Sequence, residues 1–177
     1  MSEKILVTYA TKYGSTQGVA EAITEELRAK GHTVDLTPAR DVKSLDGYTA
    51  VVLGSPLYIN SILGDASKFL AYHKDTLTQI TTVFFVLGPL YNTPKDMTEV
   101  QAQLDSVLAK LPWFKPVDAK IFTGAMDLKK FRFPDSLLKM MPANKDNSLF
   151  KTYDGRDWEA IRAWADSLDG LFQQQSA

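Results

Sequence analysis

Small hydroxylated residues gather at one bend near the N-terminus, within the segment "TYATKYGSTQG". An apolar run precedes this bend and an amphipathic run follows it, and the bend contains Thr11, Gly14, Ser15 and Thr16. Hydroxyl groups can donate hydrogen bonds to phosphate oxygens, and a glycine lets a ligand approach the backbone closely. A helix that begins here also presents unpaired N–H groups and the positive end of its dipole. The bend therefore predicts a phosphate site, and an ordinary strand-to-helix turn remains the alternative from this segment alone.

The known nucleotide motifs do not fit this bend. The sequence contains no G-x-x-x-x-G-K-[ST], and "GSTQG" is not G-x-G-x-x-G. ATP, GTP and dinucleotides are therefore not the expected ligands.

Two further loops carry a tyrosine beside glycine and proline. They are "GSPLYINSILG" (54–64) and "LGPLYNTP" (87–94), and both follow apolar runs that we expect to be strands. Because the carboxyl ends of parallel strands meet at one edge of a sheet, Tyr58 and Tyr91 are expected near the phosphate bend. Two such rings can flank a flat ligand, although each alone is equally typical of a surface or core aromatic. Together the three loops indicate a mononucleotide with a large planar base.

Strand-like and helix-like segments alternate along the chain, which predicts an α/β fold with a doubly wound parallel sheet. Strands are expected at 4–10, 33–36, 48–56, 81–88 and 119–125. Helices are expected at 15–30, at 61–73, from Thr93-Pro94 and from Asp157, the last with Trp158 and Trp164 buried.

The chain is expected to form a single domain over residues 1–177 with an insertion at about 126–153 after the fifth strand. The insertion is too long for an ordinary connection and carries its own apolar patch, consisting of Leu137, Leu138, Met140 and Met141. A lid, a partner surface and a binding insertion are the roles that it could serve.

The composition excludes several classes of function. A formal charge of -1 provides no field to attract nucleic acid, and the absence of cysteine excludes disulfides and thiolate metal sites. His32 and His73 lack a third nitrogen or sulfur ligand, so no zinc site is expected. No segment approaches the length of a signal peptide or membrane span, which predicts a cytoplasmic protein.

These residues resemble a flavodoxin. "YATKYGST" is similar to that family's phosphate loop for FMN, and "GSPLY" and "LGPLY" are similar to its two loops around the isoalloxazine ring. The resemblance implies strand order 2-1-3-4-5 and FMN as cofactor. The residues that it implies for cofactor binding are Thr11, Lys12, Tyr13, Gly14, Ser15, Thr16, Ser55, Pro56, Leu57, Tyr58, Ile59, Asn60, Leu87, Gly88, Pro89, Leu90 and Tyr91. Tyr13 departs from the family, which commonly has threonine there, so a backbone amide or Lys12 is expected to replace one phosphate contact.

The C-terminal part resembles the flavodoxin-type, menaquinone-dependent protoporphyrinogen oxidases. The similar segments are "FTGAMDL", the basic and aromatic "KKFRFPDSLLKMM", and "YDGRDWEAIRAWADSL". Residues 129–133 favour a solvated loop with two rings folded into the core, and peripheral contact with a membrane surface is the alternative.

Three functions follow from these observations. The first is an FMN electron-transfer protein that works with a redox partner protein. The second is an FMN-dependent dehydrogenase linked to a quinone and similar to the protoporphyrinogen oxidases. The third is a flavodoxin-like binding or regulatory module without flavin.

Overall fold

The computed structural model describes residues 2–89, 93–130 and 152–175. The strands are β1 (Lys4–Tyr9), β2 (Thr33–Pro38), β3 (Ala50–Tyr58), β4 (Ser61–Ile62), β5 (Thr81–Leu87), β6 (Asp118–Phe122), β7 (Ala125–Met126) and β8 (Tyr153–Asp154). The helices are α1 (Ser15–Ala29), α2 (Gly64–Tyr72), α3 (Lys74–Leu77), α4 (Pro94–Ala109) and α5 (Trp158–Gln175), with short 3₁₀ turns η1 (Ala39–Asp41) and η2 (Leu128–Lys130).

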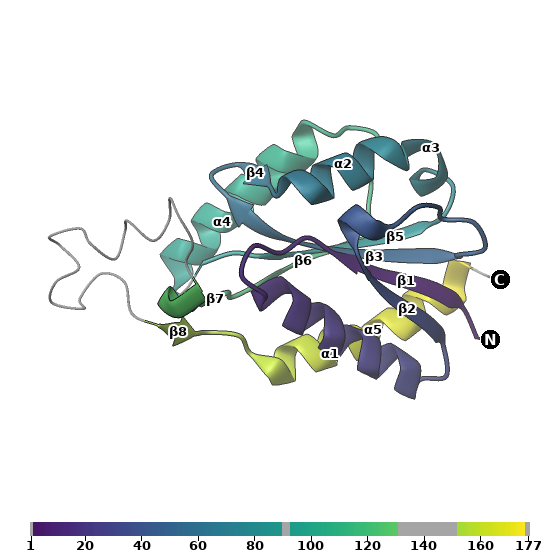
Figure 1. The fold of residues 1–177 in the computed structure, drawn as a ribbon, viewed down its shortest axis with the longest axis horizontal. Helices are drawn as coiled ribbons and strands as arrows, with labels where there is room; N and C mark the ends of the chain where they lie inside the picture. The colour runs from purple at the N-terminus through teal and green to yellow at the C-terminus, as the bar shows by residue number, and fades with distance from the viewer. Residues whose placement is uncertain (1, 90–92, 131–151, 176–177) are drawn as a thin grey trace, which may run out of the picture.

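The central sheet has the order β2-β1-β3-β5-β6, and all four of these pairings are parallel (Figure 1). Strand β4 pairs antiparallel with the end of β3 and lies off this path. When the short β4 is set aside, the order is the predicted 2-1-3-4-5. The α/β class and the doubly wound parallel sheet are confirmed.

Side chains of the central strands are buried on both faces of the sheet. Ile5 and Val7 belong to the hydrophobic cluster on one face, whereas Leu6 between them belongs to the cluster on the other. Neighbouring Phe84 and Phe85 divide in the same way. A run of unbroken apolar residues therefore forms a strand here, because both faces are covered by helices.

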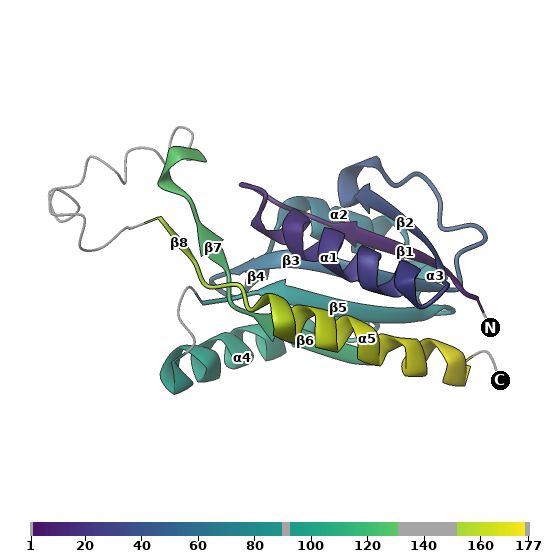
Figure 2. The ribbon, with the colours of Figure 1, turned by 90° about the horizontal axis from the view of Figure 1, so that it is seen from below.

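Helices α1 and α5 lie side by side on one face of the sheet, and α2 and α4 cover the other (Figures 1 and 2). Arg162 of α5 pairs with Glu26 of α1 at 2.8 Å, and Lys30 pairs with Asp166. His32, which follows α1, accepts a hydrogen bond at Nδ1 from the amide of Glu3, at 3.1 Å.

Several predicted boundaries were wrong around the end of β3. The strand was expected to end at residue 56, but it continues to Tyr58, because Leu57 and Tyr58 pair with β4. The chain then turns back as β4, and α2 begins at Gly64 rather than at residue 61. A tight hairpin was missed because its central residues include no glycine.

The last helix begins as predicted, with one error in its buried face. The Asp157 carboxylate accepts a hydrogen bond from the Ala160 amide at 2.9 Å, which caps the helix. Trp164 is buried, but Trp158 is 39% exposed. Trp158 lies in the first turn, where its ring contacts the Arg156 side chain instead of the core. Within the described residues, no helix combines the length and hydrophobicity needed to span a membrane.

The fifth predicted strand is broken after Phe122, at Thr123 and Gly124. Beyond this break, β7 and β8 form a two-stranded antiparallel ribbon that projects past the end of the sheet (Figure 2). The ribbon joins both ends of the predicted insertion. The insertion's apolar patch at 137–141 lies outside the described residues.

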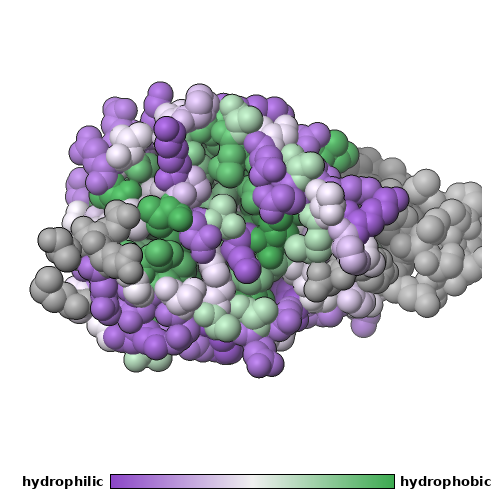
Figure 3. All heavy atoms as spheres, turned by 180° about the vertical axis from the view of Figure 1, so that it is seen from behind, coloured by the Kyte–Doolittle hydropathy of each residue, from purple (hydrophilic) through white to green (hydrophobic). Residues whose placement is uncertain are grey.

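Strand β6 forms one edge of the sheet, between α4 and α5 (Figure 2). The face seen from behind shows hydrophobic side chains that reach the surface among hydrophilic ones (Figure 3). Val117, just before this strand, is 43% exposed, and the charged Lys120 is exposed on the strand itself. A charge on an edge strand disfavours pairing with another chain.

Candidate functional site

The phosphate-type bend follows directly from the buried strand β1. Gly14 is the N-cap residue of α1 and has φ 93°, a left-handed conformation that glycine adopts without steric cost. The Thr11 hydroxyl accepts a hydrogen bond from the Gly14 amide at 2.9 Å, which fixes the bend. No side chain caps α1, so its first amides remain available to a ligand.

Thr16 has the most informative environment in this bend. Thr16 is fully buried, and its Oγ1 atom has no hydrogen-bond partner within the described residues. An unpaired buried hydroxyl costs about 1–3 kcal/mol, so it is rarely left without a partner in a folded protein. A bound anion at the start of α1 would supply the missing acceptor.

The second predicted loop connects β3 to β4. Ile59 and Asn60 both have positive φ, at 41° and 58°, which is the conformation of a two-residue hairpin turn. A left-handed conformation is strained for a β-branched residue, and Ile59 is also 89% exposed. Gln103 of α4 accepts a hydrogen bond from the Asn60 amide, and Lys110, which follows α4, donates one to the Asn60 carbonyl, so both hold this turn in place.

Ser55 does not have the predicted environment. It lies within β3 and is fully buried, so it is not a loop hydroxyl. Its hydroxyl donates to the Pro56 carbonyl at 2.9 Å and accepts from the Leu63 amide at 3.1 Å. Ser55 therefore connects β3 to the segment that leads into α2.

The third predicted loop follows β5. Gly88 donates its amide to the Phe122 carbonyl, and a Cβ atom there would lie 2.5 Å from Val100. Only glycine fits between β5 and α4 at this position. Leu90 and Tyr91 lie outside the described residues.

These three loops surround one cavity of about 1130 Å³, larger than the roughly 300–1,000 Å³ of many small-molecule sites. The predicted residues that line it are Thr11, Lys12, Tyr13, Ser15, Pro56, Leu57, Tyr58, Ile59, Leu87, Gly88 and Pro89. Gly14, Thr16 and Asn60 belong to the same loops without lining the cavity. Tyr58 is half exposed at the wall.

The structure adds a fourth wall that the sequence analysis missed, consisting of residues 124–127 around β7. Two basic residues near the same ribbon also approach the phosphate bend. The Nζ atom of Lys130 lies 3.9 Å from the position that a Cβ atom on Gly14 would occupy. The Arg156 guanidinium donates to the Ser15 carbonyl at 3.3 Å. Both lie more than a hundred residues from the bend in sequence, so no local pattern could have indicated them.

Asp154 and Trp158 hold Arg156 in place. The guanidinium forms a two-pronged pair with Asp154, at 2.8 and 2.6 Å, and lies 4.6 Å from the centre of the Trp158 ring. This hydrogen-bonded pairing is the main reason that the pKa of the Asp154 carboxyl is below its ordinary value of 3.8. The Arg156 charge is therefore largely matched by Asp154.

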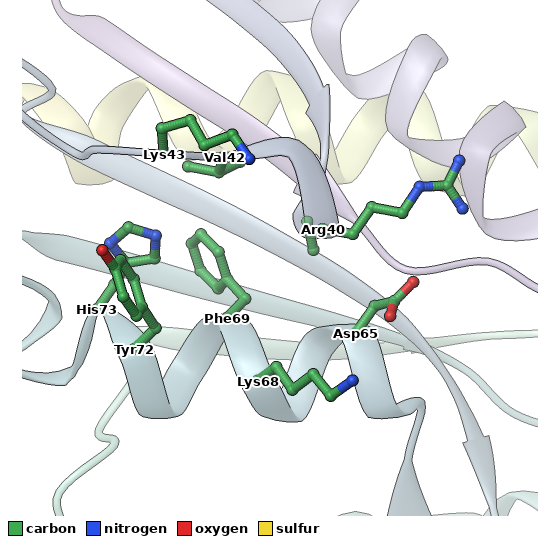
Figure 4. Close-up of a pocket in the computed structure, with 9 residues that line it drawn as sticks. Arg40, Val42, Lys43, Asp65, Lys68, Phe69, Tyr72 and His73 are labelled. Atoms are coloured by element: carbon green, nitrogen blue, oxygen red, sulfur yellow. The ribbon is translucent and has the colours of Figure 1, made fainter.

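A second, smaller cavity of about 500 Å³ lies between η1 and α2 (Figure 4). Arg40, Lys43 and Lys68 line it together with Phe69 and His73. Asp65 and Lys68 of α2 line both this cavity and the larger one. This cavity carries cationic side chains at its rim, but it lacks the converging strand-end loops of the first.

The two histidines have structural environments. Within the described part of the chain, no group of three or more potential ligands gathers as a metal site would require. His32 Nε2 lies 2.9 Å from the Asp169 carboxylate. Burial lowers the pKa of His73, whose ring packs against Phe69 and Tyr72.

The chain is similar to several known proteins. A family model described as a flavodoxin domain matches residues 6–147. An NAD(P)H dehydrogenase (quinone) of Cupriavidus metallidurans is 30% identical over 89 residues, a match that covers 38% of this chain and 45% of the relative. The chain therefore spans less than half the length of that curated relative.

Solved structures share the fold at low sequence identity. Oxidised flavodoxin 1 of Bacillus cereus is 14% identical with a TM-score of 0.55, and the match covers 94% of this chain and 97% of that one. The rubredoxin:oxygen oxidoreductase of Desulfovibrio gigas is 19% identical with a TM-score of 0.56. That match covers 98% of this chain and only 37% of the oxidoreductase.

Proposed function

The chain belongs to the flavodoxin domain family, and from that premise we propose that it is an FMN-binding redox protein that passes electrons to a protein partner. The observation that carries the proposal is the buried, unpartnered Thr16 hydroxyl at the start of α1. It lies in one of the three strand-end loops that surround the large cavity. The donors present fit a phosphate at one end of the cavity and a flat ring at the other.

The chain's own residues bind and orient the cofactor in this proposal. The amides at the start of α1 and the Thr16 hydroxyl would hold the phosphate. Tyr58 and the backbone of residues 56–59 and 88–89 would hold the ring and limit its access to water. Bound FMN supplies the electron chemistry, and the protein sets its potential and accessibility.

The visible spectrum of the purified protein tests this function. We expect a yellow protein, or a colourless one that takes up one FMN per chain on titration, with release of FMN on denaturation. A protein that remains colourless and binds no FMN would instead support a flavodoxin-like module without flavin.

A second function, an FMN-dependent dehydrogenase linked to a quinone, is favoured by the fourth wall of the cavity. Residues 124–127 line the cavity in addition to the three cofactor loops, and a quinone would lie against them beside the ring in this proposal. The name of the Cupriavidus relative agrees with this chemistry, although the aligned segment covers only part of either protein. Bound FMN would supply the two-electron, two-proton chemistry that reduces a quinone to its quinol, and the residues of the fourth wall would position the quinone.

Anaerobic reduction followed by addition of menadione distinguishes the two functions. Rapid return of the oxidised flavin absorbance would favour the quinone-linked enzyme, and a stable reduced spectrum would count against it. Oxidation of protoporphyrinogen is a narrower form of this proposal, which rests on the resemblance of the C-terminal segments. Its test is the appearance of protoporphyrin fluorescence with a quinone as acceptor.

A further inference from the structure

The 3₁₀ turn η2 places a lysine that is distant in sequence beside the phosphate bend. Lys130 is the last residue of η2, and its ammonium lies 3.9 Å from where a Gly14 side chain would begin. The ammonium is therefore within a few ångströms of the backbone that forms the anion site. Within the described residues Lys130 forms no ion pair, so its charge is not matched by a carboxylate there.

Backbone hydrogen bonds attach the segment that carries Lys130 to the core. Gly124 donates to the Pro89 carbonyl at 3.0 Å, and Gly155 donates to the Gly124 carbonyl at 3.1 Å. The paired strands β7 and β8 continue from this point. Within η2, the Lys130 amide donates to the Asp127 carbonyl at 3.1 Å. These backbone hydrogen bonds and the β7–β8 pairing fix the position of Lys130 beside the bend.

The other nearby cations have different partners. Arg156 donates a hydrogen bond to the Ser15 carbonyl in the first turn of α1, and Asp154 pairs with its charge. The Lys12 ammonium lies over the Tyr13 ring, 5.4 Å from its centre. Lys12 lines the cavity, whereas the Lys130 ammonium borders the bend at Gly14 and no carboxylate of the described residues pairs with it.

The Thr16 hydroxyl supplies an independent observation that an anion binds there. It is buried and unpartnered at the start of the same helix, as described above. A phosphate monoester carries close to two negative charges at neutral pH, and a helix N-terminus contributes only about half of a positive charge. A lysine at this distance would contribute the larger share of the countercharge.

We propose that Lys130 selects the phosphorylated form of the cofactor by pairing with its phosphate monoester at the start of α1. The inference rests on the proposed function, and it assigns FMN-over-riboflavin selectivity to the segment that leads into the insertion. Arg156 is a positioning residue in this arrangement, because it holds β8 and its neighbours against α1. The sequence analysis expected a backbone amide or Lys12 to replace the phosphate contact missing at Tyr13, and Lys130 is a further candidate for that contact.

Titration of three variants with FMN and with riboflavin tests the proposal. Riboflavin has the same ring and lacks the phosphate, so the ratio of the two dissociation constants isolates the phosphate contact. We expect Lys130→Ala to reduce the preference for FMN roughly tenfold and to leave riboflavin binding unchanged. Lys130→Arg should retain the preference. The dependence of FMN affinity on salt should also be weaker in Lys130→Ala.

Lys129→Ala is the matched control, since it removes the same charge from the adjacent exposed residue. An unchanged FMN-to-riboflavin ratio in Lys130→Ala would overturn the proposal, and so would an equal loss in Lys129→Ala. If the unaltered protein binds neither flavin, the proposed function itself fails. If it binds both flavins with the same affinity, the function stands and only the selectivity is wrong.

Discussion

At the scale of single residues, Thr16 and Thr24 form a natural comparison. Both are buried on α1, but the Thr24 hydroxyl donates to the Ala20 carbonyl at 2.8 Å, whereas Thr16 has no partner in the described structure. The unpartnered Thr16 hydroxyl lowers the stability of the cofactor-free protein, whereas it contributes a hydrogen bond once a phosphate is bound. The same hydroxyl should therefore have opposite effects on stability and on binding.

Thr16→Val tests that opposition. We expect the cofactor-free variant to be more stable than the unaltered protein by about 1 kcal/mol, because valine removes an unsatisfied buried group of the same shape. FMN affinity should fall by roughly tenfold or more, since a hydrogen bond to a charged group is lost. Urea unfolding and flavin titration measure the two effects.

Thr24→Val serves as the control for Thr16→Val. It should not increase the stability of the cofactor-free protein, and it should leave FMN affinity unchanged. If both valine variants behave alike in both assays, the phosphate contact of Thr16 is incorrect.

The buried His73 imidazole predicts how stability depends on pH. Burial lowers its pKa from the ordinary 6.5, so below that pH the unfolded chain takes up a proton more readily than the folded one. The free energy of unfolding should therefore decline as the pH falls from about 7.5 to 5.5, by at most about 1.4 kcal/mol per pH unit from this group. Urea unfolding of His73→Phe over the same range should give a flatter profile; parallel profiles would contradict this assignment.

Residue types alone predicted part of the site. The hydroxyls and glycine of residues 11–16 indicated a phosphate because each is a local signal next to a strand end. Lys130 and Arg156 could not be indicated, because their position depends on where the β7–β8 ribbon lies against the core. Ser55 was assigned to a loop because Gly-Ser-Pro is typical of a turn, but its pairing with Val86 on β5 keeps it within β3.

At the scale of elements, two glycines have opposite surroundings. A Cβ atom at Gly54 in β3 would lie 2.1 Å from the Phe85 ring on the adjacent strand. At Gly170 in α5, nothing beyond the neighbouring residues and the helix's own backbone lies within 4 Å of that position. The first glycine is required for the packing of two strands, whereas the second contributes only flexibility to a helix.

Gly54→Ala and Gly170→Ala should therefore change stability in opposite directions. We expect Gly54→Ala to destabilise the protein by about 3 kcal/mol, because the fully buried Phe85 cannot move without displacing other core side chains. Gly170→Ala should stabilise it by about 0.5–1 kcal/mol, since alanine favours the helix. Chemical denaturation of both variants gives the comparison; equal effects would mean that the packing of β3 on β5 is incorrect.

Element boundaries were predictable where a local signal coincides with the tertiary contact. Thr93 accepts a hydrogen bond from the Asp96 amide, and Pro94 begins α4, as their sequence indicates. The start of α2 was wrong because Ile62 pairs with β3 before the helix begins. The apolar spacing of α5 placed Trp158 on the buried stripe, but its ring lies against Arg156 and is 39% exposed.

At the scale of the whole molecule, we propose that residues 1–177 form a single cooperative domain. The two hydrophobic clusters lie on opposite faces of the same sheet, so neither can unfold without exposing strands of the other. The cofactor cavity is formed by loops after β1, β3 and β5, which connects occupancy of the site to the stability of the entire sheet.

FMN should accordingly raise the melting temperature of the whole chain in one transition. At a free concentration a hundred times the dissociation constant, binding stabilises a folded protein by about 2.7 kcal/mol. For a domain of this size that corresponds to a rise of roughly 5–10 °C. Differential scanning calorimetry with and without FMN measures it. Two separate transitions, or a rise confined to one of them, would contradict a single domain.

The β7–β8 ribbon also has a consequence for how such a protein could diversify. Ala125 pairs with Asp154 and Met126 with Tyr153, so the chain leaves the core and returns to it at adjacent points. The length of the segment between β7 and β8 should have little effect on the stability of the sheet, because the entropic cost of closing a loop rises only slowly with its length. A lineage could therefore acquire, shorten or exchange that segment as a unit, with the electron-carrying core inherited unchanged beneath it.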